Sequence, residues 1–182
     1  MFKDILKNII GKKPAISFPE GFTMNPEQAA MIVDFQKKID TIFKRSLRIR
    51  QVDAGSCNAC EWECTALTNP IYDIQRLGID FVASPRHADV LLVTGPVSRQ
   101  MELALKRTYF ATPDPKLVIA CGDCAKDGGI YKGSYAVTNG LSQVLPVDGY
   151  IPGCPPTPSA LIRGLAQIID KYSRGTGKTS RE

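Results

Sequence analysis

Short strand-like runs alternate with helix-like segments from Leu47 onward, and this alternation constrains the fold more than any other feature of the sequence. The runs DVLLVTG (89–95) and KLVIAC (116–121) are almost continuously apolar, as strands buried on both faces are. Between them lies SRQMELALKRTYF (98–110), which predicts a helix that begins at a Ser98 cap. Strands that alternate with helices form right-handed crossovers, so we predict an α/β domain with a mainly parallel sheet and helices on both faces.

The remaining elements complete this domain and set its limits. Further strands are predicted at LRIRQVD (47–53), at DFVAS (80–84) and near Val144 to Val147, and a last helix at 157–172 has Pro158 in its first turn. We therefore place the folded domain at residues 47–172. The polar segment 173–182 is expected to be a disordered tail, and residues 1–46 an N-terminal extension with amphipathic helices at 1–10 and 25–45.

The positive charge of the chain is concentrated in this extension. Residues 1–50 hold ten Lys and Arg against five Asp and Glu, whereas the other 132 residues hold thirteen of each, so the whole net charge of +5 arises there. A basic leader is typical of contact with an acidic partner or an anionic membrane surface, and a solvated arm is the alternative. No basic stripe interleaved with aromatics indicates a nucleic-acid partner. Without an 18-residue apolar run or a secretory signal, we expect the chain to lie in the cytoplasm.

Cysteines follow three of the predicted strands. Cys57 and Cys60 come after the strand at 47–53, Cys121 and Cys124 end or follow KLVIAC, and Cys154 follows the last strand. Parallel sheets bind ligands at the carboxyl ends of their strands. Because all these loops meet at that edge, we predict a shared site there.

Four thiolates suit either zinc or an iron–sulfur cluster. Zinc pairs usually lie closer than the 60 residues between CNAC and CGDC, and zinc would leave Cys154 without a role. Cys121 ends a buried strand, where a free cysteine acts as a small apolar residue, while Cys124 lies in a glycine-rich loop that lets the backbone approach a cofactor. Cys64, expected one helical turn after Cys60, is assigned to burial. The predicted ligands are Cys57, Cys60, Cys124 and Cys154.

Four motifs in this order resemble a known family. GSCNACEWE, SPRHADVLLVTGPV, PDPKLVIACGDCAKDGGIY and VDGYIPGCPPTPSAL are similar to the small, cluster-bearing subunit of membrane-bound NiFe hydrogenases of the energy-converting and formate hydrogenlyase types. That subunit is related to the cluster-bearing 20 kDa subunit of respiratory complex I. The resemblance covers roughly residues 47–172 and leaves out the extension and the tail.

The resemblance implies a flavodoxin-like fold that carries one 4Fe–4S cluster, proximal to the NiFe centre of a separate large subunit. The family's ligands fall on the four cysteines predicted above. The chain would then exchange electrons with that centre during proton reduction or hydrogen oxidation, as one subunit of an oxidoreductase and without catalysis of its own. Implied partners are the NiFe large subunit, a ferredoxin-like iron–sulfur subunit and membrane subunits, in a complex on the cytoplasmic side of the cell membrane where this chain is peripheral.

Two alternatives remain. A complex I-type quinone oxidoreductase subunit is disfavoured because complex I relatives have two adjacent cysteines in the first motif, whereas two residues separate Cys57 from Cys60. A zinc-binding structural protein is the second alternative, and the metal content of the purified protein decides it.

Three other side chains are assigned to the site or its margin. Glu63 follows Cys60 by three residues and is a candidate proton relay at the subunit interface, or else a hydrogen-bonded anchor of the loop. Arg86, in the SPRHAD motif, is a candidate donor of hydrogen bonds near the cluster. Glu61 is expected to be exposed.

Overall fold

The computed structural model describes residues 44–175 together with Val33, Gln36, Lys37, Ile39 and Thr41. The chain divides into two units, residues 1–31 and 32–182, and the first lies outside the described residues. The helix predicted at 1–10 and most of the one at 25–45 therefore cannot be compared with the structure. Within the second helix, the described Ile39 is helical and fully buried among the core residues of the domain.

Within the described residues the sheet has five parallel strands in the order β2–β1–β3–β4–β5. Their bounds are β1 (Leu47–Asp53), β2 (Ile79–Phe81), β3 (Val90–Thr94), β4 (Leu117–Cys121) and β5 (Gly149–Ile151). This is the order of flavodoxin-like doubly wound sheets, whose ligand crevice lies where the chain reverses direction between β1 and β3. The predicted fold class is confirmed.

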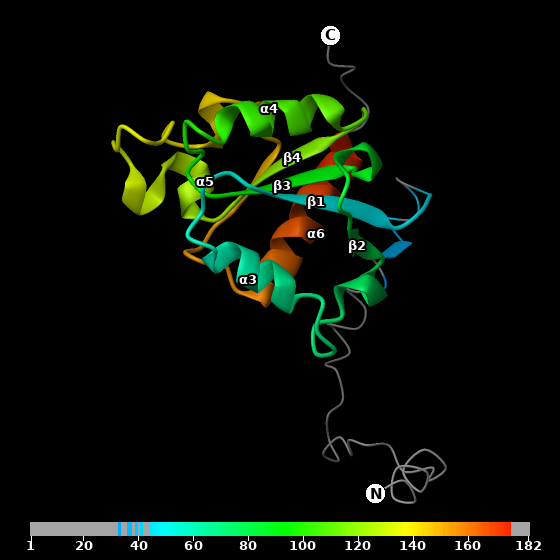
Figure 1. The fold of residues 1–182 in the computed structure, drawn as a ribbon. Helices are drawn as coiled ribbons and strands as arrows, with labels where there is room; N and C mark the ends of the chain where they lie inside the picture. Colours follow the sequence, from blue (N-terminus) through cyan, green and yellow to red (C-terminus); the bar gives the residue numbers. More distant parts are fainter. Residues whose placement is uncertain (1–32, 34–35, 38, 40, 42–43, 176–182) are drawn as a thin grey trace, which may run out of the picture. The chain divides into compact units, whose positions relative to one another are not determined.

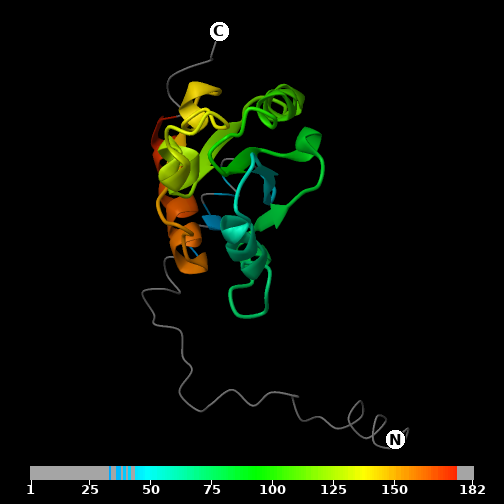
Figure 2. The same ribbon diagram turned by 60° about the vertical axis from the view of Figure 1, so that its left-hand side comes forward.

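Helices cover both faces of the sheet (Figures 1 and 2). Helices α3 (Ala59–Ala66) and α6 (Pro158–Gly175) lie on one face, and α4 (Glu102–Ala111) and the short α5 (Asp123–Asp127) lie toward the other. The residues of β4 alternate between two cores: Leu117, Ile119 and Cys121 pack with α3 and α6, while Val118 and Ala120 pack with α4 and α5. Burial on both faces explains why β4 has no charged or amide side chain and why the only polar residue of β3 is Thr94, at its end.

The last strand is not where the sequence predicted it. It lies at Gly149–Ile151, whereas Val144 to Val147 follow a 3-10 turn (Leu141–Gln143) and fill the α4-side core. Pro146 cannot donate a ladder hydrogen bond, so this apolar run serves packing and the strand forms beyond it. The prediction that this run is buried was correct, but the prediction that it forms a strand was wrong.

The helix boundaries differ modestly from the prediction. Helix α4 begins at Glu102 rather than at Ser98, because Ser98 heads a preceding turn in which its Oγ accepts from the Met101 amide at 3.3 Å. Helix α6 has a side-chain cap, since Thr157 Oγ1 accepts from the Ala160 amide at 3.3 Å. Helix α6 continues to Gly175, so residues 173–175 are helical where we expected disorder, and 176–182 lie outside the described residues.

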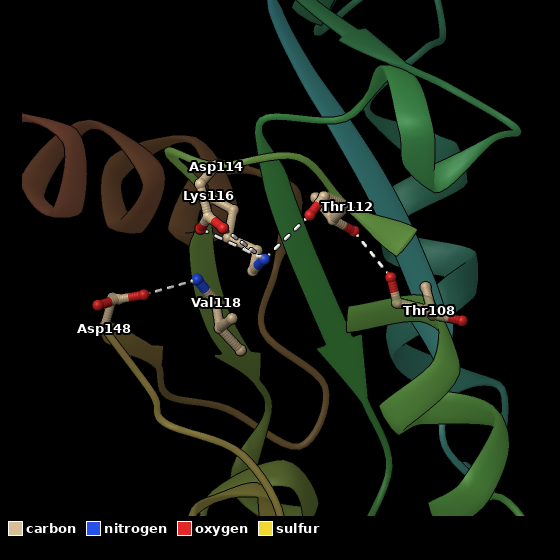
Figure 3. Close-up of polar contacts among 6 residues, drawn as sticks. All are labelled: Thr108, Thr112, Asp114, Lys116, Val118 and Asp148. Atoms are coloured by element: carbon tan, nitrogen blue, oxygen red, sulfur yellow. Dashed lines mark hydrogen bonds and ion pairs between the residues drawn. The ribbon is translucent and has the colours of Figure 1, made fainter. Parts of the chain in front are cut away.

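Polar contacts fix the amino end of β4, away from the cysteines (Figure 3). The Val118 amide donates to the Asp148 carboxylate at 2.8 Å, which ties β4 to the segment that leads into β5. Lys116 Nζ donates to the Thr112 carbonyl at 2.9 Å and lies 3.3 Å from the Asp114 carboxylate, which joins the end of α4 to the strand. These contacts anchor the strand whose other end delivers Cys121.

Candidate metal centre

The loop after β1 presents the first two cysteines. The Asp53 carboxylate accepts hydrogen bonds from two loop amides, including that of Ser56 at 2.8 Å, and Ser56 Oγ accepts from the Asn58 amide at 3.1 Å. Asn58 has φ 69° and turns the chain directly into α3. This sequence of turns leaves Cys57 exposed on the loop and buries Cys60 in the first turn of the helix.

Two glycines in the loop after β4 make room for sulfur atoms. A Cβ on Gly122 would lie 2.8 Å from Cys60 Sγ, and one on Gly129 would lie 3.0 Å from Cys124 Sγ. Both glycines also have positive φ, 85° and 51°, a conformation that other residues rarely adopt. The glycine-rich composition noted in the sequence therefore serves close approach of the backbone to the thiols.

The loop after β5 is clasped to the loop after β4. The Asp123 amide donates to the Gly153 carbonyl at 2.9 Å, and the Gly153 amide donates to the Asp123 carboxylate at 3.2 Å. The hydroxyl of Tyr150 also donates to this carboxylate, and the two hydrogen bonds, that of Tyr150 first, lower the pKa of Asp123. This clasp fixes exposed Cys154 beside buried Cys124.

The four predicted ligands share one neighbourhood at the carboxyl edge of the sheet. Burial raises the pKa of Cys124 to about 11, and the charges of Cys154, Cys57 and Cys60 contribute in the same direction. A backbone hydrogen bond from Ile130 acts on this pKa in the opposite direction, as the smallest of the causes. Thiols that oppose one another's ionisation favour exchange of their protons for a cationic metal group, so this donor set fits a cluster. Among the described residues, no three His, Cys, Asp or Glu side chains form a group suited to a single metal ion.

The other two cysteines are buried on the α3 face, as expected, but they are not isolated from the site. Cys121 packs in the same buried core as Cys60 and Cys64. The hydrogen bond from Cys121 is the leading cause that lowers the pKa of Cys60, while the same contacts raise the pKa of Cys121 strongly. Sequence reasoning missed this contact because nothing in the spacing of the cysteines reveals which side chains meet.

The predicted acidic residues occupy different environments. Glu63 is half-buried, and its charge is among those that oppose ionisation of Cys60, so it lies within electrostatic range of the site. The prediction that Glu61 is exposed is wrong: one carboxylate oxygen is buried, and Thr94, at the end of β3, donates a hydrogen bond to the other. Glu61 faces the sheet because it lies in the first turn of α3, directly above the end of that strand.

Arg86 and His87 are exposed on a 3-10 turn, η2 (Pro85–His87), that leads into β3. Phe81 and Val90 are both paired with Ile49, so the end of β2 is level with the beginning of β3. The turn between them therefore lies toward the amino end of the central strands, whereas the cysteines follow the carboxyl ends. The role assigned to Arg86 stays a prediction.

A cavity of about 320 Å³ lies between α3 and the edge of β1 that extends beyond β2. Its lining includes Arg50 and Gln51 of β1, and Glu61 and Cys64 of α3. In the described part of the chain, Arg50 Nε and Glu61 Oε2 are buried without a hydrogen-bond partner. The cavity thus offers two unsatisfied polar atoms beside a buried thiol, a feature that the sequence did not indicate.

Exposed apolar side chains occur on the segments that carry the site. Trp62, on α3, is 67% exposed, and Ile130 and Tyr135, which follow α5, are 79% and 90% exposed. Large apolar side chains grouped on a surface mark interaction sites. Among the described residues, no helix is sufficiently long and apolar to cross a bilayer.

A parallel β2–β1–β3–β4–β5 sheet with thiol-bearing loops at its carboxyl edge defines a class of flavodoxin-like protein with a candidate metal site. Residues 57–168 match the family of the 20 kDa subunit of NADH–ubiquinone oxidoreductase, and the chain belongs to this family. It is 40% identical over 182 residues to formate hydrogenlyase subunit 7 of Escherichia coli (strain K12), covering 97% of this chain and 70% of the relative. It is 42% identical over 142 residues to a probable membrane-bound hydrogenase subunit of Pyrococcus furiosus, covering 76% and 85%.

Solved structures agree with this assignment. A chain of the membrane-bound sulfane sulfur reductase, an archaeal respiratory membrane complex, superposes with a TM-score of 0.66 at 36% identity, covering 75% of this chain and 76% of that chain. A chain of an NAD⁺-reducing [NiFe]-hydrogenase superposes with a TM-score of 0.53 at 18% identity, covering 70% and 93%, which supports the fold alone. The resemblance stated from the sequence motifs is confirmed.

Proposed function

We propose that this chain is the electron-transfer subunit of a membrane-bound NiFe hydrogenase complex, with one 4Fe–4S cluster held by Cys57, Cys60, Cys124 and Cys154. The overall reaction is the reversible combination of two protons and two electrons into hydrogen. The observation that carries the proposal is the convergence of these four thiols at one edge of the sheet, where the other three oppose ionisation of Cys124. Membership in a family whose members include subunits of oxidoreductase complexes supports it.

When bound, the cluster supplies one-electron transfer, and the residues of this chain set its position and surroundings. Cys60 and Cys124 are buried, which shields one side of the site from water, while Cys57 and Cys154 are exposed and bring its other side to the surface. Electrons therefore need to cross only the boundary with a neighbouring subunit. Beyond the four proposed ligands the sequence has only two cysteines, too few for a second thiol set that binds nickel, so catalysis belongs to a partner.

That partner is the large subunit with the NiFe centre, and we place it over the exposed cysteines. The exposed Trp62, Ile130 and Tyr135 provide apolar contact area on the same segments. Half-buried Glu63 lies near Cys60 and would relay protons at this boundary. A ferredoxin-like iron–sulfur subunit would supply or accept electrons.

The chain would be peripheral, on the cytoplasmic side of the cell membrane. The basic extension 1–46 is the proposed contact with lipid or with a membrane subunit, and relatives include a formate hydrogenlyase subunit and a probable membrane-bound hydrogenase subunit. Deletion of 1–45 should release the complex from the membrane, and unchanged attachment would exclude this role.

A second candidate function is electron transfer to a substrate other than protons. It is favoured by the structural match to a sulfane sulfur reductase and by the family's description as a subunit of a quinone oxidoreductase. Sulfane sulfur reduction would differ from hydrogen production in the partner subunit, whereas the two residues between Cys57 and Cys60 argue against the quinone-reducing branch. Assays of the purified complex for hydrogen evolution, sulfane sulfur reduction and quinone reduction separate them.

Metal analysis of the anaerobically purified complex tests the proposal directly. About four irons with sulfide for this chain, and an EPR signal from it after dithionite reduction, are expected. Cys124→Ser should remove this signal, whereas the control Cys121→Ser should retain it. Zinc without iron in this chain would refute the cluster and support the zinc-binding alternative.

A further inference from the structure

The ladder between β1 and β2 ends at Ile49. This residue is the last of β1 that pairs with β2, and its carbonyl accepts from the Val82 amide at 2.9 Å. The chain then bends at Ala83 and leaves the sheet, whereas β1 continues to Asp53. Because β1 is paired with β3 as far as Asp53, its carboxyl half has a neighbouring strand on one side only, as far as the described residues go.

Gln51 presents its main chain at this open edge. The main-chain groups of successive strand residues face alternate sides, and the Leu47 amide and the Ile49 carbonyl face the β2 side. The N–H and C=O of Gln51 therefore face the same side, and no backbone group in the described part of the chain pairs with them. An unpaired strand edge is a template on which another chain can add a strand.

The cavity of about 320 Å³ lies along this open edge. It is lined by Arg50 and Gln51 of β1, by the end of β2 and the bend after it, and by Glu61 of α3. Its walls include the exposed Thr65 and Ala83, so the space opens to the surface. Because an engineered cavity of about 150 Å³ holds a benzene ring, this one has room for a short peptide stretch with water beside it.

Two polar atoms in this cavity require partners of opposite kinds. Arg50 Nε is a donor and Glu61 Oε2 an acceptor, and both are buried without a hydrogen-bond partner among the described residues. The other oxygen of Glu61 accepts from the Thr94 hydroxyl, which itself accepts from Gln51 Nε2 at 3.2 Å, so Glu61 is held in place. The opposite charges of Arg50 and Glu61 favour an uncharged occupant that offers both an acceptor and a donor, as a peptide group does.

We propose that an uncharged, extended segment of the large subunit adds to β1 in this cavity and pairs with the main chain of Gln51. Its peptide groups accept from Arg50 Nε and donate to Glu61 Oε2, while its backbone continues the line of β2. The large subunit is the partner because Trp62, over which we place it, is 67% exposed on α3, three residues before Thr65 at the opening of the cavity. The inference rests on this part of the proposed function and not on the cluster.

The matched variants Gln51→Pro and Gln51→Ala separate the main chain from the side chain. Both remove the amide side chain, but only Gln51→Pro removes the N–H, and proline is tolerated at a strand edge where that N–H has no partner within the chain. The large subunit should dissociate from the anaerobic complex with a constant about three- to tenfold higher for Gln51→Pro than for Gln51→Ala. Equal dissociation constants for the two variants overturn the inference.

Hydrogen exchange of the wild-type complex decides if Gln51→Pro does not assemble. The Val52 amide faces β3, with which it is paired, and serves as the internal reference. The Gln51 amide should exchange within about tenfold of the Val52 rate, because both are then held in a ladder. Faster exchange means that the cavity contains only solvent, and it overturns the inference.

A photoreactive p-benzoylphenylalanine in place of the exposed Ala83 identifies the occupant in the assembled complex. A cross-link to an uncharged segment of the large subunit is expected. A cross-link to a second copy of this chain, to a small molecule, or to no other subunit overturns the inference. Absence of iron from a wild-type complex that gives the expected cross-link would instead refute the proposed cluster and leave this inference standing.

Discussion

Gly122→Ala should destabilise the candidate site far more than an alanine at a glycine with similar φ elsewhere. Gly122 has φ 85° and ψ 161°, a region occupied almost only by glycine, which costs another residue about 1–3 kcal/mol. The new Cβ would also lie 2.8 Å from Cys60 Sγ, and such overpacking costs about 1–3 kcal/mol more. Together these amount to about 2–6 kcal/mol, a large part of the 5–15 kcal/mol that stabilises a typical domain.

Gly78→Ala is the matched control. Gly78 has φ 77° in the ordinary left-handed region, and its added Cβ would meet no atom within 4 Å, so only the backbone cost of about 1–2 kcal/mol applies. The assay is the thermal midpoint of the anaerobic complex together with the iron retained after purification. Gly122→Ala should lower the midpoint further than the control and lose iron, because Cys60 is displaced. Equal midpoints with full iron in both variants would refute the proposed contact between Gly122 and the Cys60 sulfur.

Other predictions concern the rest of the domain. Asp89→Ala removes a buried carboxylate that accepts from the Arg48 backbone amide at 3.0 Å and from the Arg45 side chain. Denaturant unfolding should show a free energy of unfolding lower by about 2–4 kcal/mol, and a decrease below about 0.5 kcal/mol would contradict this. The hydrogen bond from the Gly129 amide, with a smaller effect of Lys132, lowers the pKa of Asp127 in the folded protein. The ionised Asp127 therefore contributes to folding stability above the unfolded pKa, and this contribution is lost as pH falls through the folded pKa. When the free energy of unfolding is measured against pH, Asp127→Asn should lack this pH-dependent contribution. Identical pH profiles for the wild type and the variant would exclude it. Trp62→Glu should weaken co-purification of the large subunit while leaving the iron of this chain in place, and undiminished co-purification would move the interface elsewhere.

The sequence predicted the sheet well because burial on both faces leaves a simple signature. The run that forms β4 is apolar throughout and that of β3 is apolar up to Thr94, which is typical of short strands buried on both faces. The position of β5 was predicted wrongly because its three residues, Gly149–Ile151, are less typical of a strand than the valines before them. Those valines pack in the core on the α4 side of the sheet. Hydrophobicity locates buried segments, but Pro146 and the tertiary context decide which of them joins the ladder.

The cysteines illustrate the same limit. The positions of the cysteines in loops after parallel strands were sufficient to predict that the four proposed ligands lie at one edge of the sheet. The topology of the sheet alone determines that edge. The contact between Cys60 and Cys121 depends instead on register and on which face of β4 the side chain occupies, and neither is encoded in the spacing of the cysteines. The environment of Glu61 was mistaken for the same reason, because its neighbour Thr94 belongs to a strand more than thirty residues away.

The cavity beside α3 makes the surroundings of the proposed cluster unequal on its two sides. Buried polar atoms such as Arg50 Nε and Glu61 Oε2 require partners, and a space of about 320 Å³ admits several water molecules, each of which occupies about 30 Å³ in the liquid. Water in this space would reach buried Cys64, which lines the cavity. Under the proposed function, water held there would add to the solvent reorientation that accompanies each electron transfer.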